Sequence, residues 1–304
     1  MRIVGFATLL AIVPLAGSAQ DANSVFAGAD PDLEYAENRY WVYPTGGGGL
    51  WAWSSTDKVH WVRQDLLLDL QNIRWAADDG AARHHLWAPD MVRANGRWYF
   101  YFSIGPQNPT PSRLGVATCK GPSGPCADSG KPLFTGGNGF EAIDPAVFID
   151  PKSRIPYLYA GGSAGAKLRV WVLKPDMVTI EREVSVVQPR NFTEGAFMHE
   201  RRGVYYLSYS AGRWNDASYQ VHYSTAPSPT GPWRYRGTIL QSDRTHKGPG
   251  HHSFLRDPAG GNWLIAYHRW EGQSGEGPYK GSRRVVIDKI GYRRDGSILP
   301  IRMK

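Results

Sequence analysis

The segment Asp30-Pro31-Asp32-Leu33 sets the pattern of this chain, because variants of it return at nearly regular distances. Each copy begins with a polar or small residue and runs into an apolar one. The later copies are Ala88-Pro89-Asp90-Met91, Asp144-Pro145-Ala146-Val147, Glu194-Gly195-Ala196-Phe197 and His251-His252-Ser253-Phe254. They are separated by about 50 to 60 residues, a spacing typical of β-propeller blades.

An aromatic, strand-forming run follows each of these segments. The runs are Tyr40-Trp41-Val42-Tyr43, Trp98-Tyr99-Phe100-Tyr101, Tyr157-Leu158-Tyr159, Tyr205-Tyr206-Leu207 and Trp263-Leu264-Ile265. The chain also holds 35 Gly and 22 Pro, which supply many turns and leave little room for long helices. We therefore predict one all-β domain over residues 20–304, a five-bladed β-propeller with four antiparallel strands per blade. A β-sandwich would explain the strands but not the five matched openings.

The first nineteen residues, 1–19, have the pattern of a secretory signal peptide. Arg2 gives a positive start, residues 4–15 are mostly apolar, and Gly17-Ser18-Ala19 offers small residues for cleavage. The apolar stretch is too short to span a membrane. We expect a secreted or periplasmic protein without a membrane anchor.

The chain has two cysteines, Cys119 and Cys126, on either side of a Gly- and Pro-rich loop. In an exported protein such a pair favours a disulfide over free thiols, and a metal site would need further ligands nearby. We expect the bond to fasten a loop and to take no part in chemistry.

The formal net charge of +8 is spread along the chain apart from a few arginine pairs. Scattered basic residues fit solvated blade edges better than a nucleic-acid surface, and export argues further against nucleic acid. We expect no nucleic-acid partner, and we expect the protein to be a monomer.

The start of each innermost strand of a propeller lies at the central axis, so residues distant in sequence meet there. Asp30, Asp144, Glu194 and His251 would converge, with Ala88 leaving space. Crowded carboxylates repel one another and raise at least one pKa, which indicates function over structure. Two carboxylates of different pKa suit glycosidic bond cleavage.

The sequence surroundings of the three acids also indicate different catalytic roles. Glu194, followed by an apolar strand and near Asp144, is expected to keep its proton and act as general acid. Asp30 lies in a polar segment and is expected to stay ionised as general base. Asp144 would tune the pKa of Glu194 and hold sugar hydroxyls. Asp32 and Asp90 are expected to cap turns.

Together, the segments around Asp30, Ala88, Asp144, Glu194 and His251, in this order, resemble glycoside hydrolase family 43 over the whole mature chain. The resemblance implies a five-bladed propeller that hydrolyses with inversion at the anomeric carbon. It implies the same three roles for Asp30, Asp144 and Glu194. It also implies a calcium ion near the centre, contacted by His251. Because imidazole is a poor ligand for calcium, we expect water to complete most of its coordination.

Three more residues are candidates for binding the sugar. Trp87, with the neighbouring His85, precedes Ala88 and is expected to stack on a sugar face at the pocket rim, although a core role for Trp87 is equally consistent. Arg269, favoured over His268, resembles the family's positive contact to the terminal sugar.

The sequence thus predicts an inverting glycoside hydrolase, an exo-acting α-L-arabinofuranosidase on plant cell-wall arabinan or arabinoxylan. β-Xylosidase, endo-arabinanase and β-galactofuranosidase activities of the same family are alternatives. A carbohydrate-binding propeller without catalysis is a further alternative, but it would not require three converging acids.

Overall fold

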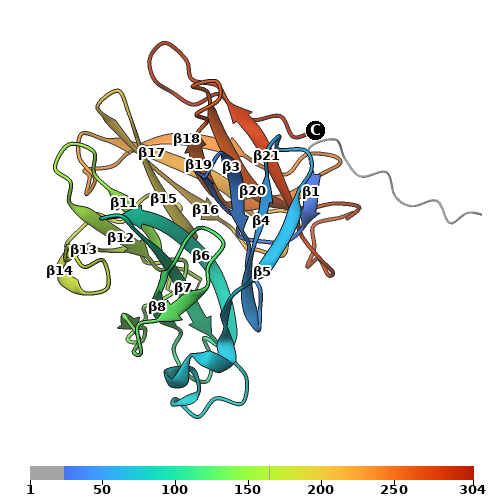
Figure 1. The fold of residues 1–304 in the computed structure, drawn as a ribbon. Coiled ribbons are helices and arrows are strands. Elements are labelled where there is room, and N and C mark those ends of the chain that lie inside the picture. Colours follow the sequence, from blue (N-terminus) through green and yellow to red (C-terminus); the bar gives the residue numbers. More distant parts are fainter. Residues whose placement is uncertain (1–23, 164) are drawn as a thin grey trace, which may run out of the picture.

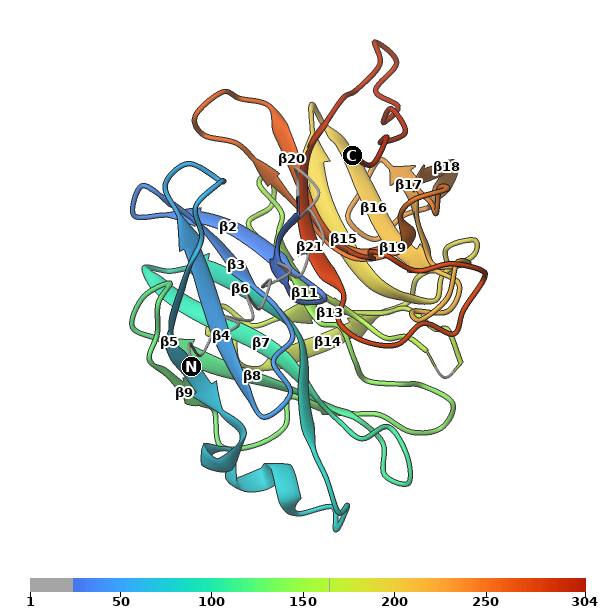
Figure 2. The ribbon, with the colours of Figure 1, turned by 90° about the vertical axis from the view of Figure 1, so that its right-hand side faces the viewer.

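The computed structural model describes residues 24–163 and 165–304, and the predicted signal peptide at 1–19 lies outside them. Five antiparallel sheets form the blades of a propeller, as predicted (Figures 1 and 2). The innermost strands β2, β6, β11, β15 and β19 contact one another in turn, and β19 contacts β2, which closes the ring. Among the described residues, no helix is long and apolar enough to cross a membrane.

The strands follow the chain blade by blade. Blade 1 contains β2 (Asp32–Ala36), β3 (Arg39–Tyr43), β4 (Gly49–Ser55) and β5 (Val62–Asp69). Two short 3-10 helices, η1 (Leu70–Asn72) and η2 (Arg74–Ala77), lead to the next blade. Blade 2 contains β6 (His85–Ala94), β7 (Arg97–Gly105), β8 (Arg113–Cys119), β9 (Cys126–Asp128) and β10 (Phe134–Thr135). Here β8 pairs with both β9 and β10, so two short strands share the outer position.

The remaining blades have four strands each. Blade 3 contains β11 (Ala146–Ile149), β12 (Pro156–Ala160), β13 (Arg169–Leu173) and β14 (Ile180–Val184). Blade 4 contains β15 (Glu194–Arg201), β16 (Val204–Ala211), β17 (Gln220–Ala226) and β18 (Arg234–Leu240). Blade 5 contains β19 (Lys247–Arg256), β20 (Trp263–Trp270), β21 (Arg284–Ile290) and β1 (Ser24–Ala27). The N-terminal strand β1 pairs with β21, so the start of the described chain completes its last blade.

The core consists of apolar clusters that lie between neighbouring blades. Phe100 packs toward blade 1, whereas the next residue, Tyr101, packs toward blade 3. Leu158 and Tyr159 divide in the same way between the two neighbours of blade 3. Because successive strand residues point to opposite faces, a blade with both faces covered needs apolar residues at every position. This explains the unbroken aromatic runs, which a half-exposed sandwich strand would not have.

Side chains from one blade also bond to the backbone of the next. Asp32 accepts a hydrogen bond from the Met91 amide at 2.9 Å, and Asp90 accepts one from the Val147 amide at 2.9 Å. Ser253 closes the ring by accepting from the Leu33 amide at 2.8 Å. The expectation that Asp32 and Asp90 cap turns is therefore wrong; they connect adjacent innermost strands.

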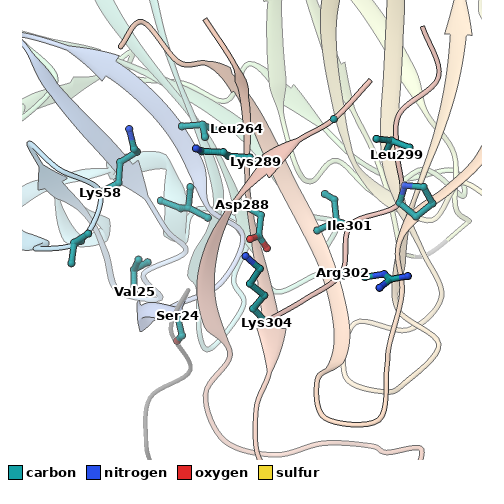
Figure 3. A pocket seen from close by; sticks show the side chains of 14 residues that line it. Ser24, Val25, Lys58, Leu264, Asp288, Lys289, Leu299, Ile301, Arg302 and Lys304 are labelled. Atoms are coloured by element: carbon teal, nitrogen blue, oxygen red, sulfur yellow. The ribbon is translucent and has the colours of Figure 1, made fainter. Parts of the chain in front are cut away.

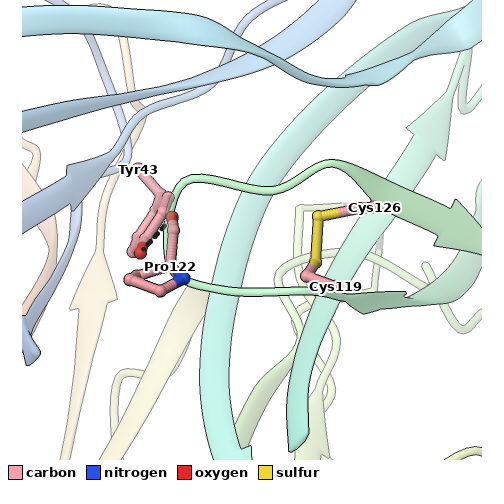
Figure 4. Close-up of a disulfide and its surroundings, with 4 residues drawn as sticks. All are labelled: Tyr43, Cys119, Pro122 and Cys126. Atoms are coloured by element: carbon pink, nitrogen blue, oxygen red, sulfur yellow. Dashed lines mark hydrogen bonds between the residues drawn. A yellow bond between two sulfur atoms is a disulfide. The ribbon is translucent and has the colours of Figure 1, made fainter.

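The predicted disulfide between Cys119 and Cys126 is present and joins the ends of the loop between β8 and β9 (Figure 4). The Tyr43 hydroxyl donates a hydrogen bond to the Pro122 carbonyl at 2.9 Å and attaches the same loop to blade 1. The disulfide is thus a local fastening of the loop, as expected.

Candidate active site

The entry to each innermost strand has an unusual backbone conformation. The φ angle is positive at the five equivalent residues Asp30 (51°), Ala88 (42°), Asp144 (56°), Gly195 (61°) and His251 (39°). Non-glycine residues seldom adopt this conformation, and they gather at functional sites when they do. The strand register also shifts at these points in blades 2, 4 and 5.

This geometry corrects the alignment of the fourth segment. Gly195, and not Glu194, is equivalent to Asp30, Asp144 and His251. Glu194 lies one residue earlier, paired with Ser210, as Trp87 in blade 2 is paired with Ser103. The general acid candidate therefore enters the site from a different strand position than the other acids.

Each of the five equivalent backbone amides is held by a side chain of the preceding blade. The bonds are Ala88 N–H to Thr45 Oγ1 (2.8 Å), Asp144 N–H to Ser103 Oγ (3.4 Å), Gly195 N–H to Asp144 Oδ2 (3.1 Å), His251 N–H to Ser210 Oγ (2.8 Å) and Asp30 N–H to His268 Nδ1 (3.1 Å). This circle of bonds fixes the innermost strand starts relative to one another.

Asp30 is buried within a set of donors and charges. Its Oδ2 accepts a hydrogen bond from the Thr45 hydroxyl at 2.6 Å, and its Oδ1 accepts one from Arg283 at 3.1 Å. Burial alone would raise the pKa of Asp30, but the positive charge of Arg283, the largest lowering influence, holds it well below its usual range. Asp30 is therefore ionised at neutral pH, through its charged neighbours and not through the polar segment on which the prediction relied.

Asp144 has the opposite character. Its Oδ2 accepts the Gly195 amide, which ties it to the residue next to Glu194. Burial raises the pKa of Asp144 well above its usual range, and the charges of Glu194 and Asp30 add to the shift. Burial thus favours the protonated form of Asp144, the predicted modulator.

Glu194 is buried and held at both oxygens. Tyr219 donates to Oε1 at 2.8 Å, and Ser163 donates to Oε2 at 2.5 Å. Burial and the nearby charges of Glu194 and Asp144 raise the pKa of Tyr219 well above its usual range, so its hydroxyl stays protonated. A Cβ atom at Gly162 would lie 2.4 Å from the Glu194 Cβ, so glycine is needed there for close approach.

His251 lies between the acids. Its Nδ1 is 3.5 Å from Asp30 Oδ1 and 3.5 Å from Asp144 Oδ2. Burial lowers the pKa of His251 in spite of these carboxylates, so the ring is neutral near pH 7. The structure thus brings Asp30, Asp144, Glu194 and His251 together, as the sequence predicted.

Arg269 is not brought to this site. Its side chain is fully buried and forms an ion pair with Glu271 at 2.9 Å. The alternation of side chains along β20 places Arg269 and His268 on opposite faces, and it is His268 that reaches Asp30. The arginine that reaches the site is Arg283, which precedes β21; we correct the assignment of Arg269 accordingly.

The two predicted aromatic residues form a small stack. The rings of His85 and Trp87 are nearly parallel, with centroids 5.9 Å apart, and His85 is exposed while Trp87 is half-buried. Trp87 lies against the backbone of Gly105, where a Cβ atom would lie 2.0 Å from its ring. A partly exposed ring beside Ala88 is consistent with a sugar contact.

Trp214 is an aromatic residue that the sequence analysis did not select. Its side chain is 46% exposed, and the Arg283 guanidinium lies 5.1 Å from its ring centre. Because Arg283 also contacts Asp30, it connects Trp214 to the carboxylates. Thr45, Ser163 and Tyr219 were missed as well. Thr45 could have been identified by aligning the repeats, because it is a hydroxyl residue just beyond an aromatic run.

The space at the axis is narrow. A cavity of about 10 Å³ lies among the strand starts, lined by residues that include Asp32, Asp90 and His251. A separate pocket of about 920 Å³ lies on blade 5 and the C-terminal segment (Figure 3). Asp288 is the one acidic side chain among its described lining residues, so the pocket offers no pair of side-chain carboxylates.

Comparison with known proteins agrees with the geometry. The family model "Glycosyl hydrolases family 43" matches residues 22–298. A β-D-galactofuranosidase of Aspergillus niger is 34% identical, covering 92% of this chain and 84% of its own length. An extracellular endo-α-(1→5)-L-arabinanase of Bacillus subtilis is 28% identical, covering 82% of this chain and 84% of its own length.

A solved structure extends this comparison. It is a family 43 β-xylosidase/α-arabinofuranosidase from a compost microbial metagenome, in complex with xylotriose and described as a calcium-free form. The identity is 26% and the TM-score 0.73, covering 90% of this chain and 94% of that one.

Proposed function

Because this chain belongs to glycoside hydrolase family 43, we propose that it is an exported, exo-acting α-L-arabinofuranosidase that removes terminal arabinofuranose from arabinan or arabinoxylan. The observation that supports a hydrolase at this site is the convergence of an ionised Asp30, a high-pKa Asp144 and a doubly hydrogen-bonded Glu194. A propeller that only binds sugar has no need for such an arrangement.

In the proposed mechanism, Glu194 protonates the departing glycosidic oxygen. Asp30 takes a proton from a water molecule that attacks the anomeric carbon from the opposite face, which inverts its configuration. Asp144 holds the Gly195 amide and so orients the strand start beside Glu194. Arg283 keeps Asp30 ionised and would also contact the sugar, and Trp87 and Trp214 would stack on its faces.

A terminal β-D-galactofuranose is the second candidate, because the relative from Aspergillus niger is named for it. The two sugars share the configuration of the furanose ring, and galactofuranose carries one extra hydroxymethyl group on its side chain. A pocket formed for the smaller sugar discriminates against such a group by about 10- to 200-fold.

The test is a panel of aryl glycosides. We expect the highest kcat/KM with the α-L-arabinofuranoside, at least about tenfold above the β-D-galactofuranoside and β-D-xyloside. Linear arabinan should yield free arabinose from the outset. Preference for another sugar would replace the proposed substrate, and early release of oligosaccharides would show endo action.

We also propose a calcium ion near His251. Asp32, Asp90 and His251 line the axial cavity, but no group of three or more metal-binding side chains that could hold an ion is found within residues 24–163 and 165–304. The donor set therefore fits only a weakly held ion with water ligands, and a cavity of about 10 Å³ would have to widen to admit it.

Thermal unfolding tests the calcium proposal without reference to activity. Calcium chloride should raise the Tm by a few degrees relative to EDTA, since an ion that binds only the folded state stabilises it. The increase should be smaller in His251→Ala. Equal Tm values with calcium and EDTA would contradict a calcium site.

A further inference from the structure

Tyr219 connects the two groups that the proposed function assigns to proton transfer. It lies directly before β17 and its side chain is fully buried. Its hydroxyl donates to Glu194 Oε1 at 2.8 Å. Its ring stacks on His268 with 5.7 Å between centroids and 9° between planes. His268 in turn accepts the Asp30 amide and lies 3.2 Å from Asp30 Oδ1.

The ring of Tyr219 is also fixed from a third side. A Cβ atom at Gly250 would lie 2.0 Å from Tyr219 Cε1, so the backbone before His251 touches the ring directly. The ring is thus fully buried, with His268 stacked on it and the Gly250 backbone against it. The direction of its hydroxyl is therefore determined by the packing of blades 4 and 5.

We propose that Tyr219 is a positioning residue that holds Glu194 in the orientation for proton donation and sets its distance from Asp30. This inference rests on the proposed function of the site. The contact is to one oxygen of Glu194 only. The other oxygen, Oε2, is contacted by the exposed Ser163, and the glycosidic oxygen would take the place of that hydroxyl by accepting a hydrogen bond from Oε2 when Oε2 carries the proton. Tyr219 would thus keep the carboxyl group aligned while the substrate enters.

The leaving group of the substrate provides a sharp test. A leaving group that departs as a sugar hydroxyl requires full protonation by the acid, whereas an activated aryl group leaves with little help. If Tyr219 aligns the acid, Tyr219→Phe should reduce kcat/KM for the oligosaccharide substrate by about tenfold to a hundredfold, which is the contribution of a hydrogen bond to a charged group. It should reduce kcat/KM for the 2,4-dinitrophenyl glycoside by less than about threefold.

Tyr209→Phe is the matched control, because Tyr209 is a buried tyrosine of the same blade whose hydroxyl donates to the Arg190 carbonyl instead. It should affect both substrates equally and slightly. Gly250→Ala is the second variant: it keeps the Tyr219 hydroxyl but displaces the ring, and it should show the same selective loss.

The results separate this inference from the proposed function. Both substrates are made with the sugar that the wild-type enzyme releases. If that sugar is not arabinofuranose, the arabinofuranosidase proposal fails, but the comparison of the two leaving groups remains valid. Equal losses on the two substrates in Tyr219→Phe would show that Tyr219 only packs the site. Unchanged rates on both would show that its hydroxyl has no role.

Discussion

Glu194→Gln should reduce kcat on arabinan by about a thousandfold, within the range for loss of a general acid. Glutamine can still accept the Tyr219 hydroxyl through its amide oxygen, and the exposed Ser163 hydroxyl can accept from the amide nitrogen, but glutamine has no acidic proton to give. Alanine would also abolish the acid, yet it would leave Tyr219 without its acceptor and cost about 1–3 kcal/mol of stability. The amide variant therefore isolates the chemical role.

The measurement is kcat for arabinan and for a 2,4-dinitrophenyl arabinofuranoside, with Tm as a check on folding. Activity on the dinitrophenyl substrate should largely survive. Glu183→Gln serves as the control, since Glu183 pairs with Arg169 on the outer part of blade 3. If arabinan hydrolysis is unchanged in Glu194→Gln, the acid lies elsewhere and the assignment of this site fails.

The fold could be predicted because a propeller repeats its physical requirements. Every blade needs a strand start at the axis and central strands that are apolar on both faces. The aromatic runs ending at Tyr43, Tyr101 and Tyr159 meet the second requirement, because their alternate residues pack against the two neighbouring blades. The closing strand β1 could not be predicted, because the four residues Ser24–Ala27 are too few to carry a pattern. Its partner β21 lies about 260 residues away, so only the closed ring reveals the pairing.

The candidate site could be predicted in part for the same reason. Asp30, Asp144 and His251 occupy repeated positions, and repetition is visible in a sequence. Arg283 and Tyr219 come from the β20–β21 and β16–β17 connections, which differ from blade to blade. The choice of Arg269 over His268 failed because adjacent strand residues face opposite sides, and sequence alone did not say which face of β20 meets Asp30.

The pKa pattern also depends on such contacts. Asp30 and Asp144 are both buried aspartates beside His251, yet their pKa values move in opposite directions. Arg283 donates directly to Asp30 and lowers its pKa, whereas the charges of Glu194 and Asp30 raise the pKa of Asp144. A sequence pattern that places two acids at equivalent positions cannot distinguish them, because the distinguishing charge comes from a loop.

Asp30→Asn should lower kcat by up to about ten-thousandfold, because the amide cannot accept a proton from water. The side chain keeps its size and can still accept the Thr45 hydroxyl, so the fold should persist.

The wild type should release its sugar first as the inverted anomer, as seen by NMR, since a base that activates water gives inversion. Release with retention would mean that Asp30 is not this base.

The pH dependence tests the same role through the neighbours of Asp30, which are Arg283, His251, His268 and Asp144. Because the pKa of Asp30 lies well below its usual range, the base stays ionised as the pH falls. The value of kcat/KM should therefore decrease only at strongly acid pH. Arg283→Gln removes the largest lowering influence, so the pKa of Asp30 must rise and the acid limb of the profile should move to higher pH. A limb that stays in place would show that another group controls it. Arg283→Lys keeps the charge and should restore most of the acid tolerance, which separates the effect of charge from any loss of sugar binding.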